Sequence, residues 1–120
     1  MNASIISKKN VKSSVLDALA TQLPVIIAGV LEVPGGNLAR LKPRQISLEF
    51  SQASLRDVGS DIRIMVYARK NDPRASTENE LAKTILEKVI AMIKDSGEEH
   101  SIDIRLYLMD IGAAEHALTT

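Results

Sequence analysis

Cysteine and tryptophan are absent from this sequence of 120 residues, and its aromatic residues are only Phe50, Tyr67 and Tyr107. The absence of cysteine excludes disulfide bonds, thiolate metal sites and cysteine nucleophiles. With so few aromatic rings there is almost no platform on which nucleic-acid bases could stack. The core must therefore be built from aliphatic side chains.

An excess of charge of one sign is also missing, because fifteen Lys and Arg residues balance fifteen Asp and Glu residues. No long-range field therefore draws the chain to phosphate backbones or anionic lipids. No stretch approaches 18 uninterrupted apolar residues, and the first residues lack the apolar core of a signal peptide. The two histidines, His100 and His116, are too few for a histidine-rich metal site. We expect a cytoplasmic protein with no metal or other cofactor and no nucleic-acid or membrane partner.

The first half of the chain has the pattern of a strand, a helix and a strand. A short apolar run predicts a strand at 3–7, and an apolar stripe at three- and four-residue intervals predicts a helix over 14–31. Pro24 lies inside this stripe, which predicts a kink or a break into two segments. Proline and glycine at 33–37 end the helix, and alternating polarity at 45–50 predicts the second strand.

The second half repeats this order. Alternation predicts strands at 62–69 and 102–109, and a loop is expected at 70–75. An apolar stripe predicts a helix from Thr77 to the residues before Gly97, which is expected to end it.

Two pairs of residues have the spacing of helix-capping boxes. Ser14 and Asp17 stand three positions apart at the start of the first helix, and Thr77 and Glu80 do so at the start of the second. In such a box each side chain accepts a hydrogen bond from the other residue's backbone N–H. We expect both helices to begin at these pairs.

The sequence thus predicts one α+β domain made of two βαβ units, with a four-stranded mixed sheet and two helices on one face. We assign residues 1–58 to the first unit, 59–112 to the second and 113–120 to a tail. This arrangement leaves one sheet face without a helix, and that face mixes both charges with methionine and tyrosine. It carries Gln45, Ser47, Glu49, Arg63, Met65, Tyr67, Arg69, Asp103, Arg105, Tyr107 and Met109.

This second sheet face has two interpretations. One is a face that stays in contact with water, as antiparallel sheets commonly have. The other is an interface between copies of the chain in a symmetric oligomer, whose composition is semi-polar. In either case we expect Arg63 and Arg105 to form ion pairs across strands or between subunits, with Glu49 and Asp103 as the acids on the same face.

The order and length of the elements resemble the tautomerase superfamily, which includes 4-oxalocrotonate tautomerase and macrophage migration inhibitory factor. Two stretches support the resemblance. Residues 23–34 look like the family's first helix running into a proline-containing turn, and residues 61–83 look like its second unit. The resemblance implies a homotrimer with three sheets around a central axis and parallel strand pairs within each βαβ unit. A ferredoxin-like module, with antiparallel neighbours throughout, is the alternative fold.

The family's chemistry uses an N-terminal proline whose amine acts as a general base or nucleophile. This chain begins Met1-Asn2, and asparagine cannot supply that amine; its size also disfavours methionine removal. An internal proline nitrogen is an amide without basicity. We therefore assign no catalytic residue.

The resemblance also implies carboxylate binding by basic residues near the ends of the first and third strands. The matching residues are Lys8, Lys9, Arg69 and Lys70, and a guanidinium can hold a carboxylate through two hydrogen bonds. The alternative is that all four are solvated surface charges. His100 is expected to be exposed in a loop and inert, as is His116 in the tail.

Three functions remain open at this stage. The first is an oligomeric binding or structural protein, a self-associating homotrimer without proline chemistry. The second is an isomerase-like or lyase-like enzyme that acts on a small keto or unsaturated carboxylic acid. The third is a ferredoxin-like module that binds a regulatory ligand.

Overall fold

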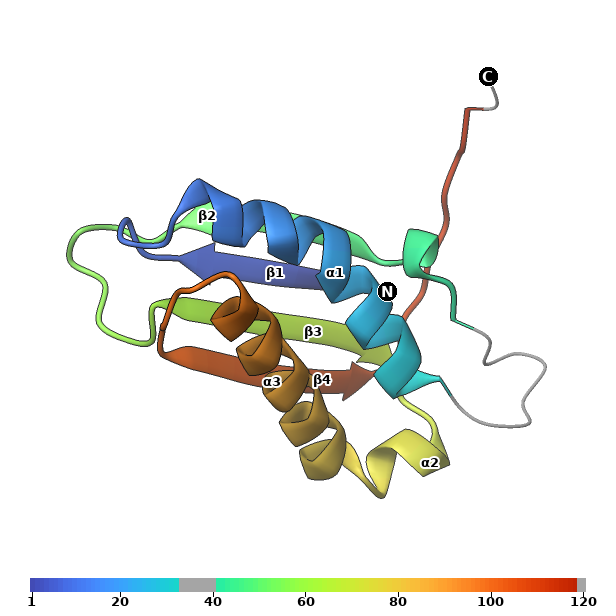
Figure 1. Cartoon of the computed structure of the whole chain (residues 1–120). Coiled ribbons are helices and arrows are strands. Elements are labelled where there is room, and N and C mark those ends of the chain that lie inside the picture. The colour runs from blue at the N-terminus through green and yellow to red at the C-terminus, as the bar shows by residue number, and fades with distance from the viewer. Residues whose placement is uncertain (33–40, 119–120) are drawn as a thin grey trace.

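The computed structural model describes residues 1–32 and 41–118, and the elements occur in the predicted order. The predicted helix end at residues 33–37 lies outside these ranges. The strands are β1 (Asn2–Ser7), β2 (Ser47–Gln52), β3 (Ile62–Arg69) and β4 (Ile102–Met109). The helices are α1 (Ser13–Leu31), α2 (Asp72–Ala75), α3 (Glu78–Asp95) and the 3₁₀ turn η1 (Pro43–Gln45) (Figure 1).

The four strands form one mixed sheet in the order β2-β1-β3-β4. β1 and β2 are parallel, β3 and β4 are parallel, and the central pair β1 and β3 is antiparallel. Each parallel pair is thus joined through its own helix, α1 or α3. This confirms the two βαβ units and excludes the ferredoxin-like alternative, because only one of the three neighbouring pairs is antiparallel.

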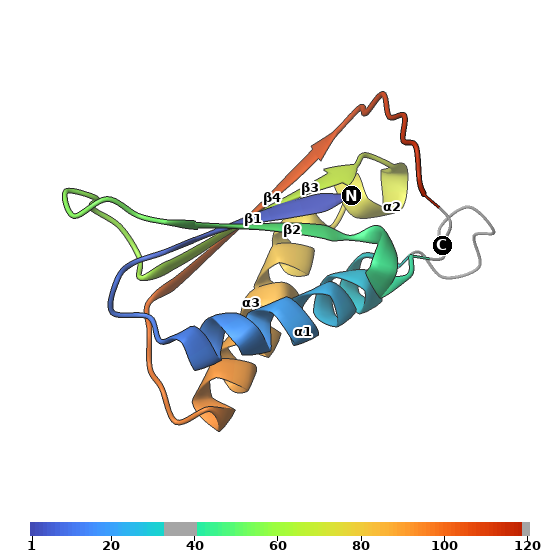
Figure 2. The same ribbon diagram turned by 90° about the horizontal axis from the view of Figure 1, so that it is seen from above.

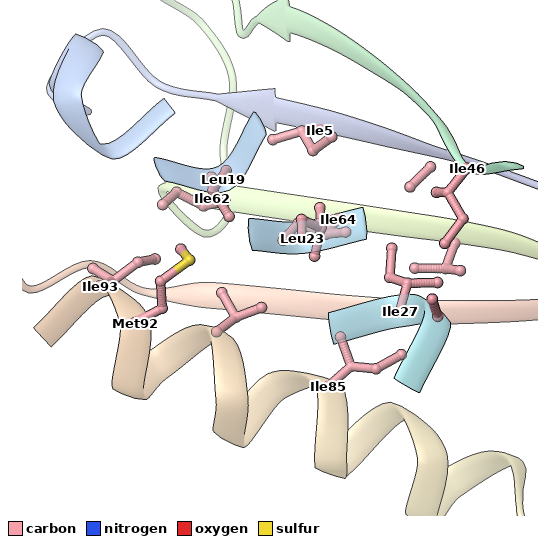
Figure 3. Packing of buried hydrophobic residues seen from close by; sticks show 14 of the residues in the cluster. Ile5, Leu19, Leu23, Ile27, Ile46, Ile62, Ile64, Ile85, Met92 and Ile93 are labelled. Carbon is pink, nitrogen blue, oxygen red and sulfur yellow. The ribbon is translucent and has the colours of Figure 1, made fainter. Parts of the chain in front are cut away.

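Both long helices cover the same face of the sheet, as the view from above shows (Figure 2). The buried stripe of α1 includes Leu19, Leu23 and Ile27, and that of α3 includes Ile85 and Ile93. These side chains meet the inward-facing isoleucines of β1 and β3 (Figure 3). The core is aliphatic throughout, as the composition requires.

α1 is one uninterrupted helix that contains Pro24, so the predicted break did not occur. Leu23 and Ile27, which flank the proline, are both fully buried, and this packing offsets the hydrogen bond that the proline cannot form. α1 is also long and apolar enough to cross a membrane by length and composition alone. Its buried stripe accounts for part of that apolar character, since 33% of the span is buried inside the structure.

Neither predicted capping box forms. Lys12 is the residue that precedes α1, and no side chain caps it, because Ser14 already lies inside the first turn. Thr77 does precede α3, but its hydroxyl donates to the carbonyl of Pro73 at 2.9 Å. The predicted end of α3 is confirmed, since Gly97 adopts a φ of +81° and its N–H donates to the carbonyl of Lys94 at 2.9 Å. A positive φ of this size favours glycine.

Residues 70–75, predicted as a loop, contain the short helix α2. Asn71 precedes it, and its side-chain oxygen accepts a hydrogen bond from the backbone N–H of Arg74 at 3.0 Å. Pro73 lies in the first turn, where it costs no hydrogen bond. An asparagine cap followed by a proline is a signal for a helix start, but four residues are too short for a periodic apolar stripe to mark the helix in the sequence.

Candidate functional site

The start of β1 lies at one end of the sheet, beside the end of β3. Asn2 is the first residue of β1, is exposed, and stands opposite Ser47 of β2 and Tyr67 of β3. The carbonyl of Met1 accepts a hydrogen bond from the N–H of Ser47 at 3.1 Å, and the Met1 side chain packs against the core. The position at which β1 begins is therefore held by an asparagine, whose carboxamide has no basic nitrogen.

No proline stands at a strand start within residues 1–32 and 41–118. Pro24 lies inside α1, Pro43 in η1 and Pro73 in α2, while Pro34 is outside the described ranges. Each of these nitrogens is part of a peptide bond, so none is basic. The geometry therefore offers no internal substitute for an amine at the start of β1.

Arg69 and Lys70 lie at this same end of the sheet, at the end of β3. Both side chains are exposed. The Arg69 guanidinium donates to the carbonyl of Ile111 at 3.2 Å, and the backbone N–H of Lys70 donates to the carbonyl of Met109 at 3.0 Å. Arg69 is thus partly engaged by the chain that follows β4, and it retains donors for a ligand.

Arg74 of α2 was not predicted and is the buried cation nearest to this end. Its residue is 6% exposed. Nε and Nη2 donate to the carbonyl of Leu31, the last residue of α1, at 3.1 and 2.9 Å, and Nη1 donates to the carbonyl of Arg69 at 2.9 Å. Burial lowers the pKa of this guanidinium. Arg74 therefore fastens the end of α1 to the end of β3, beside Arg69.

Lys8 and Lys9 follow β1 at the opposite end of the sheet. Ser7 pairs with Ile62, the first residue of β3, whereas Arg69 is the last. Seven residues of strand separate the two ends by about 20 Å. Within one chain the four predicted ligand-binding residues therefore do not form one site.

The two lysines instead border a separate hollow of about 340 Å³. The start of α1 and the end of β2 form its other walls, including Leu16 and Phe50. Phe50 is 40% exposed. The hollow thus combines two ammonium groups with an apolar wall.

His100 is not the exposed residue that was predicted. Its side chain is only 3% exposed, and Nδ1 lies 3.0 Å from Oδ2 of Asp61. Asn10 also donates to that carboxylate oxygen, at 3.3 Å. The loop position was predicted correctly, but the partner is 39 residues away in the sequence, and no local pattern indicates such a contact.

The helix-free sheet face carries residues in aligned rows across the strands. One row contains Ser47, Asn2, Tyr67 and Tyr107, and the next contains Glu49, Ser4, Met65 and Arg105. The rings of Tyr67 and Tyr107 stack with their centroids 5.2 Å apart.

The ion pairs on this face differ from the expected ones. Arg63 contacts Asp57 of the β2–β3 loop at 2.6 Å, and Arg105 lies 3.4 Å from Asp103 on its own strand. The acid for Arg63 comes from the loop that precedes β3, six positions earlier in the sequence. Cross-strand pairing is thus wrong for both arginines within the described part of the chain, and pairing between subunits stays a prediction.

No family profile matches the sequence, and no curated protein matches it. Solved structures do match. A member of the cis-3-chloroacrylic acid dehalogenase family is similar with a TM-score of 0.66 and 11% identity, over 92% of this chain and 76% of that one. A fused 4-OT symmetric trimer gives 0.65 and 12%, over 98% and 94%.

Malonate semialdehyde decarboxylase is similar with a TM-score of 0.64 and 10% identity, over 100% of this chain and 93% of that one. These proteins belong to the superfamily that the sequence was said to resemble. At such low identity the likeness concerns the fold. The chain has the fold of the tautomerase superfamily.

Proposed function

We propose that this protein is a homotrimer that acts in binding or in structure, without proline-dependent catalysis. The observation that carries the proposal is the helix-free sheet face. Its middle contains half-buried apolar side chains, among them Ile6, Met65 and Tyr67, and charged residues such as Glu49 and Arg105 lie beside them. The central strands of this face thus alternate these apolar side chains with Asn2, Ser4 and Arg63, and such a semi-polar mixture is found in interfaces between protein subunits.

Two further segments support association between copies. Leu55 and Val58 on the β2–β3 loop are 91% and 93% exposed, and Leu118 near the end of the described chain is 83% exposed. Figure 2 shows this loop extending beyond the sheet, and Figure 1 shows the C-terminal segment running away from the body. Packing such exposed apolar side chains against a neighbouring subunit would remove their apolar surface from water, which favours association. A similar solved structure is named a symmetric trimer.

The absence of proline chemistry rests on Asn2. A carboxamide at the start of β1 provides no lone pair of suitable basicity, so it cannot act as general base or nucleophile there. The proposed function is therefore a binding or structural role in the cytoplasm.

The trimer is tested with a matched pair of lysine substitutions. Met65→Lys places an ammonium in the middle of the helix-free face, whereas Ala20→Lys adds the same charge to an exposed position of α1. Burying an unpaired ammonium in an interface is strongly unfavourable. Sedimentation equilibrium should show a trimer for wild type and Ala20→Lys and a single chain for Met65→Lys. The same mass for Met65→Lys and Ala20→Lys would overturn the assignment of the interface to this face.

A second candidate function is an enzyme for a small keto or unsaturated acid. The observation that favours it is the position of Arg69 and Lys70, which place two cations beside the start of β1 and thus offer a carboxylate a binding site. Turnover of phenylpyruvate between enol and keto forms above the buffer rate, lost in Arg69→Ala, would favour the enzyme. No turnover across a panel of keto acids would reject the enzyme, and the binding or structural role would then be the only one of the two candidates left.

A further inference from the structure

Three loops meet around His100 at the end of the sheet opposite to Asn2. Asn10 comes from the β1–α1 loop, Asp61 from the end of the β2–β3 loop and His100 from the α3–β4 loop. The Asp61 N–H also donates to the hydroxyl of Ser101 at 2.8 Å. The hydrogen bond from His100 and that from Asn10 hold the pKa of Asp61 below its usual value. Asp61 is therefore an anion with a fixed orientation.

This carboxylate determines which nitrogen of His100 carries the proton. A carboxylate only accepts hydrogen bonds, so Nδ1 must be the donor, and in the neutral ring Nε2 then has a free lone pair. Nε2 is buried and has no hydrogen-bond partner in the described part of the chain. A buried acceptor without a partner is unfavourable, because it has lost its hydrogen bonds to water and gained none in the protein. A ligand with a donor group would remove that penalty.

His100 borders a hollow of about 510 Å³ between the end of α3 and the start of β4. Ile90, Ile93 and Ile102 form an apolar wall. The hollow therefore places a hydrophobic surface beside the residue whose Nε2 lacks a hydrogen-bond partner. This combination is typical of a site for a small organic molecule.

The charges around the hollow favour a cation. Its lining contains Asp61, Glu98, Glu99 and Lys94. Glu98 forms an ion pair with Lys12 at 2.6 Å, so its charge is neutralised. The other charges of the lining are the two negative charges of Asp61 and Glu99 and the one positive charge of Lys94. A metal ion is disfavoured, because no group of three or more acidic or histidine residues within 1–32 and 41–118 is arranged to hold one.

We propose that this hollow binds a small aliphatic ammonium ion. The ammonium donates to Nε2 of His100, the carboxylates of Asp61 and Glu99 balance its charge, and the alkyl group lies on the isoleucine wall. Nε2 has almost no exposed surface, so binding requires a shift of the loop that holds His100 to bring this nitrogen to the hollow. The site is independent of the trimer and of the start of β1.

The test uses the two histidines of the chain, whose ring nitrogens are resolved by NMR of ¹⁵N-labelled protein. Butylammonium chloride should shift Nε2 of His100 in a saturable manner, while 1-butanol and sodium butyrate at equal concentration should leave it unchanged. No saturable shift with butylammonium, or an equal shift with butanol, would overturn the proposal. A shift with zinc chloride but not with butylammonium would assign the lone pair to a metal ion and also overturn it.

A matched pair of variants separates binding from folding. His100→Asn retains an N–H donor for Asp61 at the position of Nδ1 but removes Nε2, and it should abolish the binding of butylammonium, followed through backbone amide shifts near Ile93. His116→Asn changes the other histidine, which is exposed, and should bind as wild type does. Thermal unfolding shows whether His100→Asn still folds. If this variant does not fold, Asp61→Asn is used instead, and butylammonium should then no longer shift Nε2 of His100. Binding by folded His100→Asn equal to wild type would contradict the proposal.

Discussion

Replacing Arg74 with methionine tests the account of how the end of α1 is held to the sheet. Methionine retains most of the volume of the side chain but removes three hydrogen bonds, two to the carbonyl of Leu31 and one to that of Arg69. The last carbonyls of a helix have no partner within the helix, so they depend on groups such as this guanidinium.

The size of the effect follows from what each carbonyl can find instead. Arg69 is exposed, so water can replace the lost bond there, whereas Leu31 is 1% exposed and its carbonyl loses both of its side-chain donors within residues 1–32 and 41–118. An unsatisfied buried acceptor costs about 1–3 kcal/mol. Release of the buried guanidinium from its desolvation offsets part of this cost. We expect Arg74→Met to lower the free energy of unfolding by about 2 kcal/mol, and Arg74→Lys by about 1 kcal/mol.

The measurement is urea unfolding at one fixed protein concentration, because the stability of an oligomer depends on concentration. Arg44→Met is the matched control: Arg44 is exposed in η1, and surface substitutions usually change stability by less than about 0.5 kcal/mol. If Arg74→Met were as stable as Arg44→Met, the proposed fastening of α1 would be wrong.

Three other predictions concern stability. The pKa of Asp61 is held below its ordinary value of 3.8 by the hydrogen bond from His100. Wild type should therefore be more stable than Asp61→Asn at about pH 6, and the difference should shrink as the pH falls below about 4. A difference in urea unfolding that does not depend on pH would contradict this. Gly97→Ala should destabilise the protein by about 1 kcal/mol because Gly97 has a positive φ. Gly29→Ala should stabilise it by about 0.5–1 kcal/mol, because a Cβ added at this position of α1 meets nothing within 4 Å. Equal effects of the two substitutions in thermal unfolding would refute the assignment of Gly97 as the residue that ends α3. Leu23→Ala, at a fully buried position, should cost about 2–5 kcal/mol in urea unfolding, and a cost below about 1 kcal/mol would contradict the core packing.

The alternating and helical patterns predicted the order of the elements because burial on one face repeats with a fixed period. In β3, Ile62, Ile64, Val66 and Ala68 are all buried, as alternation required. The capping boxes failed because local spacing does not show which competing partner a side chain finds. Thr77 bonds to Pro73 since α2 ends directly before α3.

The parts that could not be predicted all depend on contacts between distant segments. Arg74 reaches Leu31 across 43 positions and His100 reaches Asp61 across 39. Nothing in the neighbourhood of either residue indicates its partner. The separation of Lys8 from Arg69 follows from the antiparallel pairing of β1 with β3, which the resemblance alone could not place in register.

The mass of the wild-type protein in solution tests the central claim most directly. Sedimentation equilibrium at micromolar concentration should give three times the chain mass of 13.1 kDa, about 39 kDa, because the proposed function makes the helix-free sheet face an interface between copies. A mass of 13.1 kDa across that range would show that this face is exposed to water and would contradict the proposed function.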